Sequence, residues 1–577
     1  MKQILTIAMM MAMSLHVNAQ TTTATNYKAV GVANPISGCV FCADPTALEY
    51  KGRLYVYGSN DHQQFLKNGK KGENGYGDIK SLVVFSTDDM VNWTFHGTID
   101  VRKLCSTWST SKWWRGFHNS WAPSVTWHTT EDGKEEFFLY FANNSHGVGV
   151  LKASSPIGPW TSPLKESLIG SDTPGAVTEG ANFDPGVVID DNGVGWITFG
   201  GLPPDSADPL MTNSARIAKL KPSMIALDGS AINLPAPYHF EASELNVING
   251  KYVYTYCSNW KNRTDAAWNK YKSEHGISVS KPETCTMCYM VSDNPTDPNS
   301  WVYKGVYGPH PGSSPNNHSH LHKYQGNYYH IYHNGSLLEG MKNAKAVDSN
   351  ASTYRSICVD MVTVDETTQT ISKANLTTKG VAPIKPLDPY QLQQAETMAS
   401  CGGVNYEDFK NTASADSISA LGNDASANMY IKMAPGSWTA VRNVDFGEKG
   451  AKSFVLRAKG TGILEFRTAS KGQPIATVEF SSSTMEDHVF EIDPEVFKGT
   501  KNLFFMVFTQ ATNVQFDAWQ FYETDPSAIT VPFKATEPSA RYDLNGRRLS
   551  GDNHNGLVIE QYQDANGNTR TRKHVNK

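Results

Sequence analysis

Residues 183–199 contain Phe183-Asp184-Pro185-Gly186-Val187-Val188-Ile189, then Asp191-Asn192-Gly193 and Trp196-Ile197-Thr198-Phe199. This phrase has two apolar, alternating runs joined by a glycine-containing turn, which is the pattern of a β-hairpin. Related phrases occur four more times in the first 390 residues, at 43–59, 121–141, 240–254 and 317–332. An internal repeat of this kind indicates that one supersecondary unit is used several times.

The spacing of the copies predicts how the units are assembled. They begin at Asp44, Ala122, Asp184, Glu241 and His318, which are 57 to 78 residues apart. That distance leaves room for two further strands per copy, so each unit is expected to be a four-stranded sheet. Five such sheets arranged radially form a five-bladed β-propeller. Long helical patterns are missing between the copies, which disfavours an α/β barrel.

The repeat also predicts where chemistry occurs. If the copies are equivalent, the residue that starts each hairpin lies near the central axis at one mouth of the channel. Three of these residues are acids, namely Asp44, Asp184 and Glu241. Acids crowded on one axis repel each other, which raises some of their pKa values and separates their roles.

The composition excludes one large class of partner. The chain of 577 residues has 51 basic and 56 acidic residues, a net charge of −5, and no block of Lys and Arg. A protein that binds a nucleic-acid backbone usually carries a basic patch, so we expect no nucleic-acid partner. Polarity comes mainly from uncharged side chains, and aromatic residues make up 11%.

The N-terminus resembles a secretory signal over residues 1–19. Lys2 precedes an apolar run at residues 4–15, and Ala19 supplies a small residue for cleavage. A membrane span needs about 20 apolar residues, and neither this run nor any later segment is long enough. We therefore expect an exported protein without a transmembrane segment, located in the periplasm, at the cell surface or outside the cell.

The repeated phrases resemble glycoside hydrolase family 43, the five-bladed propeller hydrolases of arabinose- and xylose-containing polysaccharides. The resemblance covers roughly residues 30–385, and we assign 27–385 to this domain. It is carried by Ala-Asp-Pro at Asp44, Phe-Asp-Pro-Gly at Asp184, Phe-Glu-Ala-Ser at Glu241, Trp-Ala-Pro at 121–123 and Asn-Asn-His at 316–318. Ser124 stands where the family usually has an acid after Trp-Ala-Pro.

The resemblance implies an inverting hydrolysis. Asp44 would be the general base that deprotonates water, and Glu241 the general acid that protonates the leaving oxygen. Asp184 would tune the pKa of the acid and hold it or the sugar. An inverting pair is expected to lie about 6.5–9.5 Å apart with water between. Glu244 is the competing acid; strand alternation sends it to the other face, so Glu241 is preferred.

Other residues are assigned by the same resemblance. Arg355 is expected to bind substrate or a carboxylate, and His318 either lies near a calcium held largely through water or is a core histidine. The chemistry itself needs no cofactor. Five tryptophans lie between 108 and 127, and we include Trp113, Trp114 and Trp121 as candidate substrate-binding residues, although Trp121 belongs to the repeat and also suits the core.

The eight cysteines include two C-x-x-C pairs, Cys39/Cys42 and Cys285/Cys288. The pairs lie far apart, and neither has a histidine at zinc-finger spacing. Disulfides or buried small side chains are therefore favoured over a metal site. Export would permit disulfides, but the sequence does not give their pairing.

A proline-containing linker precedes a second all-β domain at 394–523, which resembles carbohydrate-binding module family 6 and is expected to be a β-sandwich (jelly-roll). Tyr430 corresponds to one sugar-stacking aromatic, whereas residues 481–484 replace the second. Gln394 stands where the family has an acid that helps to bind a structural calcium, so calcium and sugar binding are open. Residues 530–577 resemble C-terminal tails of exported proteins from Gram-negative bacteria.

These features predict an exo-acting α-L-arabinofuranosidase that acts on plant cell-wall polysaccharide. The substrates we consider are arabinoxylan, arabinan and xylo-oligosaccharides. β-Xylosidase activity is a near alternative, and endo-arabinanase activity a more distant one. A propeller that only binds glycan is the non-enzymatic alternative, which the presence of all three acids disfavours.

Overall fold

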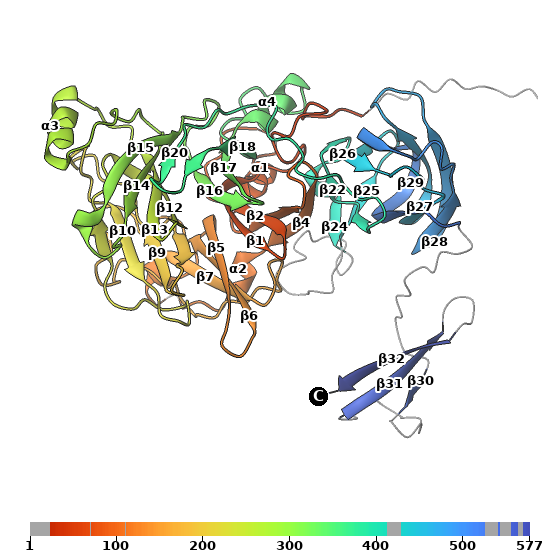
Figure 1. Cartoon of the computed structure of the whole chain (residues 1–577), viewed down its shortest axis with the longest axis horizontal. Coiled ribbons are helices and arrows are strands. Elements are labelled where there is room, and N and C mark those ends of the chain that lie inside the picture. Colours follow the sequence, from red (N-terminus) through yellow and green to blue (C-terminus); the bar gives the residue numbers. More distant parts are fainter. Residues whose placement is uncertain are drawn as a thin grey trace, which may run out of the picture. The chain divides into compact units, whose positions relative to one another are not determined.

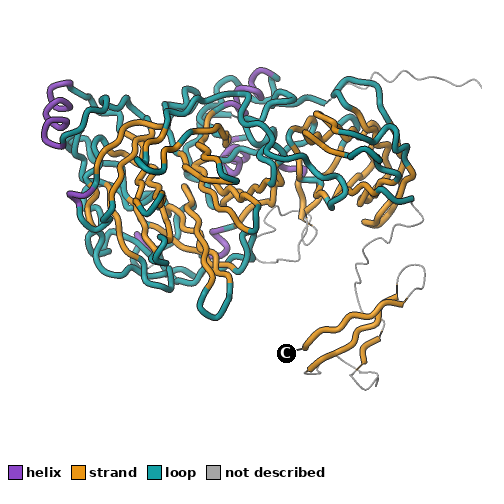
Figure 2. The backbone as a smooth tube through the Cα atoms, in the orientation of Figure 1, coloured by secondary structure: helices purple, strands orange, loops and turns teal. Residues whose placement is uncertain are grey.

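The computed structural model describes residues 24–69, 71–109, 111–411 and 429–525, and the backbone of three further strands between 540 and 576. The predicted signal, residues 1–19, lies outside the described residues. Strands dominate the described chain and helices are few and short (Figure 2). The fold is therefore all-β, as the sequence predicts.

Five sheets form the propeller, and their innermost strands make a closed ring. Contacts run from β1 (Ala43–Tyr50) to β5 (Trp121–Thr129), β8 (Gly186–Ile189), β12 (His239–Ile248), β16 (Ser319–Tyr324) and back to β1. Figure 1 labels four of these strands, β1, β5, β12 and β16. The outer strands of the first sheet are β2 (Arg53–Ser59), β3 (Leu82–Thr87) and β4 (Trp93–Ile99). The second sheet adds β6 (Glu135–Ala142) and β7 (Val148–Ala153).

The remaining three sheets follow the same antiparallel order. The third adds β9 (Gly195–Phe199), β10 (Ala215–Lys219) and β11 (Ile232–Leu234). The fourth adds β13 (Lys251–Ser258), β14 (Met287–Ser292) and β15 (Val302–Gly308). The fifth adds β17 (Asn327–Asn334) and β18 (Ser356–Val362).

The prediction of four strands per sheet is correct for the first, third and fourth sheets only. The second and fifth sheets have three named strands each. In the second sheet, bridges from Val148 to Ile169 and from Lys152 to Thr161 extend the edge without forming a full strand. At the fifth, the segment that precedes β1 lies beside β18, since the Cys42 amide donates to the carbonyl of Arg355, the residue before that strand (3.0 Å).

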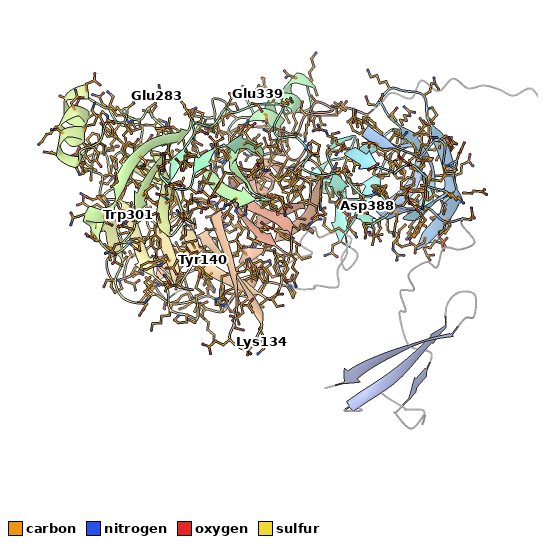
Figure 3. All side chains as sticks on the ribbon, viewed as in Figure 1. Lys134, Tyr140, Glu283, Trp301, Glu339 and Asp388 are labelled. Atoms are coloured by element: carbon orange, nitrogen blue, oxygen red, sulfur yellow. The ribbon has the colours of Figure 1, made fainter. Side chains whose placement is uncertain are left out.

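Aromatic and branched side chains hold neighbouring sheets together. One cluster joins Tyr57 and Val84 of the first sheet to Phe137 and Leu139 of the second. Large aromatic side chains bury about 150–250 Å² each, so such clusters supply most of the stabilisation between blades. Figure 3 shows the contrast along one strand pair: Tyr140 lies among packed side chains, whereas Lys134 points outward from the turn.

Helices occur only in the connections. They are α1 (Asp61–Asn68), α2 (Val101–Leu104), α3 (Asp265–His275) and α4 (Ser336–Asn343), with 3-10 turns η1 (Trp113–Arg115), η2 (Pro298–Ser300) and η3 (Tyr406–Asp408). Two short strands, β19 (Val364–Asp365) and β20 (Thr370–Ile371), form a separate hairpin. Within the described ranges, no helix combines the length and apolarity needed to cross a membrane.

The second domain is a β-sandwich with a phenylalanine-rich core. Its strands are β21 (Gln393–Gln394), β23 (Ser400–Gly402), β24 (Phe409–Asn411), β25 (Met429–Met433), β26 (Trp438–Asp445), β27 (Ser453–Arg467), β28 (Ala476–Glu491) and β29 (Thr500–Tyr522). The rings of Phe446, Phe454, Phe466 and Phe521 pack within 6 Å of one another in several pairs. This core confirms the all-β prediction for the domain.

The sandwich packs directly against the propeller. Strand β22 (Thr397–Met398) extends the first propeller sheet by pairing with β4. The buried Lys28 amino group donates to the carbonyls of Ala33 (3.0 Å) in the N-terminal segment and Ala399 (2.7 Å) in the module. Burial lowers the pKa of Lys28 to about 7. These contacts form a continuous interface.

The C-terminal segment 524–577 is a separate unit. Its described strands β30 (Ala540–Tyr542), β31 (Gly556–Gln563) and β32 (Thr569–Asn576) form a three-stranded antiparallel sheet.

All eight cysteines are buried as free thiols, without a disulfide. Among the described residues, no group of three or more His, Cys, Asp or Glu side chains is arranged to hold a metal.

Candidate active site

A cavity of about 220 Å³ lies at the start of the inner strands. It brings together most of the residues that the sequence marks as functional. Its lining comprises Asp44, Tyr76, Trp121, Ala122, Phe183, Asp184, Leu202, Glu241, Asn316, His318 and Arg355. The predicted convergence of the three acids at one mouth of the channel is therefore present in the structure.

The backbone at this mouth repeats from sheet to sheet. Asp44, Ala122, Asp184 and Ala242 all have positive φ angles, between 35° and 62°. A positive φ is uncommon for residues with a Cβ and costs free energy unless the surrounding structure enforces it. Its recurrence at the same place in four sheets identifies these four positions as equivalent.

The predicted equivalence of Glu241 with Asp44 is wrong by one residue. In the strand register, Glu241 opposes Cys257 as Ala43 opposes Ser59 and Trp121 opposes Ala142. A bulge follows each of these residues. Ala242 thus takes the place of the aspartates, and Glu241 projects into the pocket from the preceding position.

Asp44 is held in its ionised form. Burial favours the neutral acid, but Arg355, His333 and His318 act in the opposite direction and lower the pKa of Asp44 to about 2. Arg355 Nη1 donates to Asp44 Oδ1 (2.7 Å), and Ser59 Oγ donates to Oδ2 (2.7 Å). An ionised carboxylate at neutral pH is what a general base requires.

Asp184 and Glu241 have pKa values shifted in the opposite direction. Burial, and next the charge of Asp44, raise the pKa of Asp184 to about 8. Burial, and next the charges of Asp184 and Asp44, raise the pKa of Glu241 well above its ordinary value. Near neutral pH the site therefore holds one ionised acid, Asp44, and two protonated acids, Asp184 and Glu241, so both a base and an acid are present as acid–base catalysis needs.

His318 lies between the two aspartates. Its Nδ1 is 3.9 Å from both Asp44 Oδ1 and Asp184 Oδ2, and its Nε2 is buried without a partner. Burial lowers its pKa to about 4. Glu244, the competing acid, is not part of the pocket lining; it is fully buried beside Ser124 and His320. This supports the choice of Glu241.

Arg355 connects two carboxylates. Besides Asp44, it binds Asp61, whose Oδ1 accepts from Nη2 and whose Oδ2 accepts from Nε, both at 2.9 Å. The Arg355 guanidinium also lies over the Tyr76 ring, 4.9 Å from its centre. The sequence analysis identified neither Asp61 nor Tyr76, because both follow the hairpin phrases without a repeated motif.

The predicted aromatic residues divide into two groups. Trp121 lines the pocket and donates from Nε1 to the Tyr76 carbonyl (3.1 Å). Trp113 and Trp114, on η1, are 59% and 37% exposed and lie outside the pocket lining. Tyr430 is only 5% exposed. It does not present an open ring face, which corrects its interpretation as a sugar-stacking platform.

Besides Tyr76, three further lining residues were not predicted as site residues, namely Phe183, Asn316 and Leu202. Phe183 belongs to the repeated phrase, so its position was available from the sequence. Asn316 precedes His318 in the Asn-Asn-His phrase. Leu202 follows two glycines and has a positive φ of 45° with 38% of its surface exposed. Only its place after Gly-Gly gave a hint of unusual backbone.

Comparison with known proteins agrees with this site. The model of glycosyl hydrolases family 43 matches residues 32–367, and that of carbohydrate binding module family 6 matches residues 394–523. The chain is 34% identical over 512 residues to an arabinoxylan arabinofuranohydrolase of Paenibacillus polymyxa, covering 86% of this chain and 75% of the relative.

Two further comparisons concern Bacillus subtilis. An arabinoxylan arabinofuranohydrolase of strain 168 is 33% identical over 521 residues, covering 87% of this chain and 94% of the relative. The crystal structure of a family 43 arabinoxylan arabinofuranohydrolase from this organism, in complex with cellotetraose, superposes with a TM-score of 0.74 at 31% identity. It covers 87% of this chain and 100% of the solved one. The chain therefore belongs to glycosyl hydrolases family 43.

Proposed function

We propose that this glycoside hydrolase removes single α-L-arabinofuranosyl residues from arabinoxylan. The observation that carries the proposal is the pocket, which has about 220 Å³ and three carboxyl groups in its lining. Drug-sized ligands occupy about 300–1,000 Å³, so this space suits one sugar residue. The two arabinoxylan arabinofuranohydrolases that match most of the chain support the same substrate.

The opposite pKa shifts of Asp44 and Glu241 support a base and an acid, and the family resemblance implies that the reaction inverts. Asp44, ionised through Arg355, removes a proton from water as the water attacks the anomeric carbon. Glu241, protonated because burial and neighbouring carboxylates raise its pKa, donates its proton to the departing oxygen. Asp184 lies within the same lining, and its negative charge raises the pKa of Glu241 further once Asp184 ionises. One bond to the anomeric carbon forms as the glycosidic bond breaks, so its configuration inverts.

The exposed tryptophans provide a contact for the rest of the polymer. Trp113 packs against His146 (4.3 Å between ring centres) and His118 (4.7 Å), which holds its ring at the surface. Ser145, next to His146, accepts a hydrogen bond from Asn182, the neighbour of the pocket residue Phe183. We assign Trp113 and Trp114 to a subsite for the xylan backbone, and Arg355 and Trp121 to the sugar in the pocket.

A structural calcium is proposed for the module. Glu396 Oε1 and Gln394 Oε1 are buried without hydrogen-bond partners. Burial raises the pKa of Glu396 well above its ordinary value, and the nearby Asp517 raises it further. Oxygen donors of this kind are the ligands that Ca²⁺ prefers, so the residues fit the ion. Thermal melts with a chelator test this site: we expect the chelator to lower Tm and added Ca²⁺ to restore it.

The propeller channel fits calcium less well. Near His318, its unpartnered buried atoms are mainly imidazole nitrogens, and Glu244 Oε1 is the carboxylate oxygen among them. A channel ion would therefore be held largely through water. The Tm of His318→Ala, with and without Ca²⁺, separates this ion from that of the module.

Product analysis tests the function. Arabinoxylan, arabinan and xylo-oligosaccharides are incubated with the wild type, Asp44→Ala and Glu241→Ala. We expect arabinose from arabinoxylan, lost in both variants, and NMR of the first product should show inverted configuration. Xylose as the main product would favour β-xylosidase activity, and oligosaccharides from arabinan an endo-arabinanase. Arabinose release that persists in both variants would overturn the assignment.

Export is proposed from the N-terminal signal pattern of residues 1–19. Expression of the full chain in a Gram-negative host, followed by fractionation and N-terminal sequencing, tests it. A mature N-terminus at Gln20 in the periplasm, at the surface or in the medium is expected. Retention of Met1 in the cytoplasm would contradict it.

A further inference from the structure

Asp61 is a second acid that binds Arg355, the arginine that contacts Asp44. Asp61 is the first residue of α1 and is fully buried. It is not part of the pocket lining, whereas Arg355 and Asp44 are. Asp61 therefore does not touch the sugar, and any effect on the reaction passes through another residue.

Asp61 directs its carboxylate entirely at Arg355. Its Oδ2 accepts from the Arg355 backbone amide (3.0 Å) and from Nε (2.9 Å), and its Oδ1 accepts from Nη2 (2.9 Å). The side chain of the preceding residue, Asn60, makes no capping bond to α1. A paired contact of this kind fixes the plane of a guanidinium as well as its position.

The fixed plane determines where the rest of the guanidinium points. With Nε and Nη2 bound to Asp61, Nη1 is left facing Asp44 Oδ1 at 2.7 Å. Arg355 is itself only 3% exposed. A single cation thus joins two buried carboxylates, one behind the site and one inside it.

We propose that Asp61 is a positioning residue: it aims Arg355 at Asp44 and thereby keeps the base ionised and correctly oriented. The proposal rests on the proposed base role of Asp44. The ionisable groups that interact with Asp44 from the surrounding elements are Cys42, Asp61, Tyr76, Asp184, Glu241, His318, His333 and Arg355. Arg355 is the cation among these described groups, so its orientation has the largest influence of any of these charges on the pKa of Asp44.

Asp61→Asn distinguishes positioning from simple charge. If the Arg355 guanidinium turns away, Asp44 loses its neighbouring cation and its pKa rises. The acid limb of the kcat/KM profile then moves to higher pH. If Asp61 contributes only negative charge near the site, its removal leaves Asp44 easier to ionise, and the limb moves to lower pH. The two explanations therefore predict opposite shifts.

The assay uses 4-nitrophenyl α-L-arabinofuranoside between pH 3 and pH 9, a range in which the wild type should show no acid limb because the pKa of Asp44 is about 2. We expect kcat of Asp61→Asn to fall about 100-fold with KM changed less than about threefold, and an acid limb to appear within this range. A variant profile that stays flat at its acid end, like that of the wild type, overturns the proposal. Asp89→Asn is the matched control, because Asp89 is also buried and multiply hydrogen-bonded, to Asn92 and Val91, away from the pocket. It should lower Tm and leave the acid end of the profile flat.

A second variant covers failure to fold. Asp61→Glu keeps the charge but lengthens the side chain by one methylene, which displaces the Arg355 guanidinium; kcat should fall and an acid limb should appear. Wild-type kcat and profile in Asp61→Glu would overturn the proposal. If the wild type cleaves the nitrophenyl glycoside but not arabinoxylan, the proposed substrate is wrong, and the pH comparison still decides the role of Asp61.

Discussion

Replacing Asp184 with asparagine should inactivate the protein and stabilise it at the same time. The carboxyl is buried, with its pKa raised to about 8 by burial and by the charge of Asp44. An asparagine side chain has nearly the same shape, and its carbonyl oxygen can still accept the Ala242 amide, which lies 2.9 Å from Asp184 Oδ2. The variant therefore removes the charge with little change in packing.

The sign follows from proton linkage. The unfolded carboxyl has a pKa of about 3.9, so between pH 4 and pH 8 the folded state binds the proton more tightly. The free energy of unfolding must then fall as the pH rises through this window. A difference of about four pH units corresponds to about 5 kcal/mol. Asparagine does not ionise, so the free energy of unfolding of the variant does not fall in this way.

Thermal melts at unit steps from pH 4 to pH 8 measure the effect. We expect Tm of Asp184→Asn to match the wild type near pH 4 and to exceed it progressively, by about 5 °C at pH 8. Activity on arabinoxylan should fall about 100-fold, because asparagine does not hold Glu241 or the sugar as Asp184 does. The exposed Asp191→Asn is the control and should show no such divergence. A Tm difference that stays constant with pH would refute the reasoning.

Three further predictions follow from the same contacts. Glu241→Gln should lose about 10²–10⁴-fold in kcat on arabinoxylan but much less on a nitrophenyl glycoside, whose leaving group needs no proton; equal losses would contradict the acid role. Gly186→Ala places a Cβ 2.4 Å from Glu244 Cα and 2.7 Å from Ser243 O. Its Tm should therefore fall by an amount equivalent to about 1–3 kcal/mol. The control Gly77→Ala places its Cβ no closer than 3.9 Å to another atom and should leave Tm unchanged. Lys28→Met leaves two carbonyls without their donor, which should cost about 1–3 kcal/mol and lower Tm; an unchanged Tm would show that Lys28 does not help to dock the module.

The repeat made the propeller predictable, because each blade begins with the same local signal. Alternating strands, a glycine turn and an acid at the strand start are all short-range features, as at Asp44 and Asp184. A single sequence contains them in full. The number of strands per blade was less predictable, because the outer strands of the second and fifth sheets lack a repeated phrase and depend on packing.

Contacts between distant residues were not predictable in this way. Arg355 and Asp61 are 294 positions apart, and nothing local to either indicates the pair. Tyr430 illustrates the opposite error, since its local phrase resembles that of a sugar-binding aromatic while the fold buries its ring. Local chemistry thus identified the three acids that line the pocket, but their buried partners required the tertiary structure.

The one-residue offset of Glu241 explains how a symmetric ring separates a base from an acid. The positive-φ positions carry Asp44, Ala122 and Asp184, and the preceding positions carry Trp121, Phe183 and Glu241. All six line the pocket. Glu241 therefore occupies the same position in its blade as Trp121 and Phe183 do in theirs, whereas Asp44 occupies a positive-φ position. If the acid stood at residue 242 instead, all three carboxyls would occupy positive-φ positions, and none would share its position with an aromatic residue. The offset instead places Glu241 among the positions that carry Trp121 and Phe183, and leaves Asp44 among the positive-φ positions.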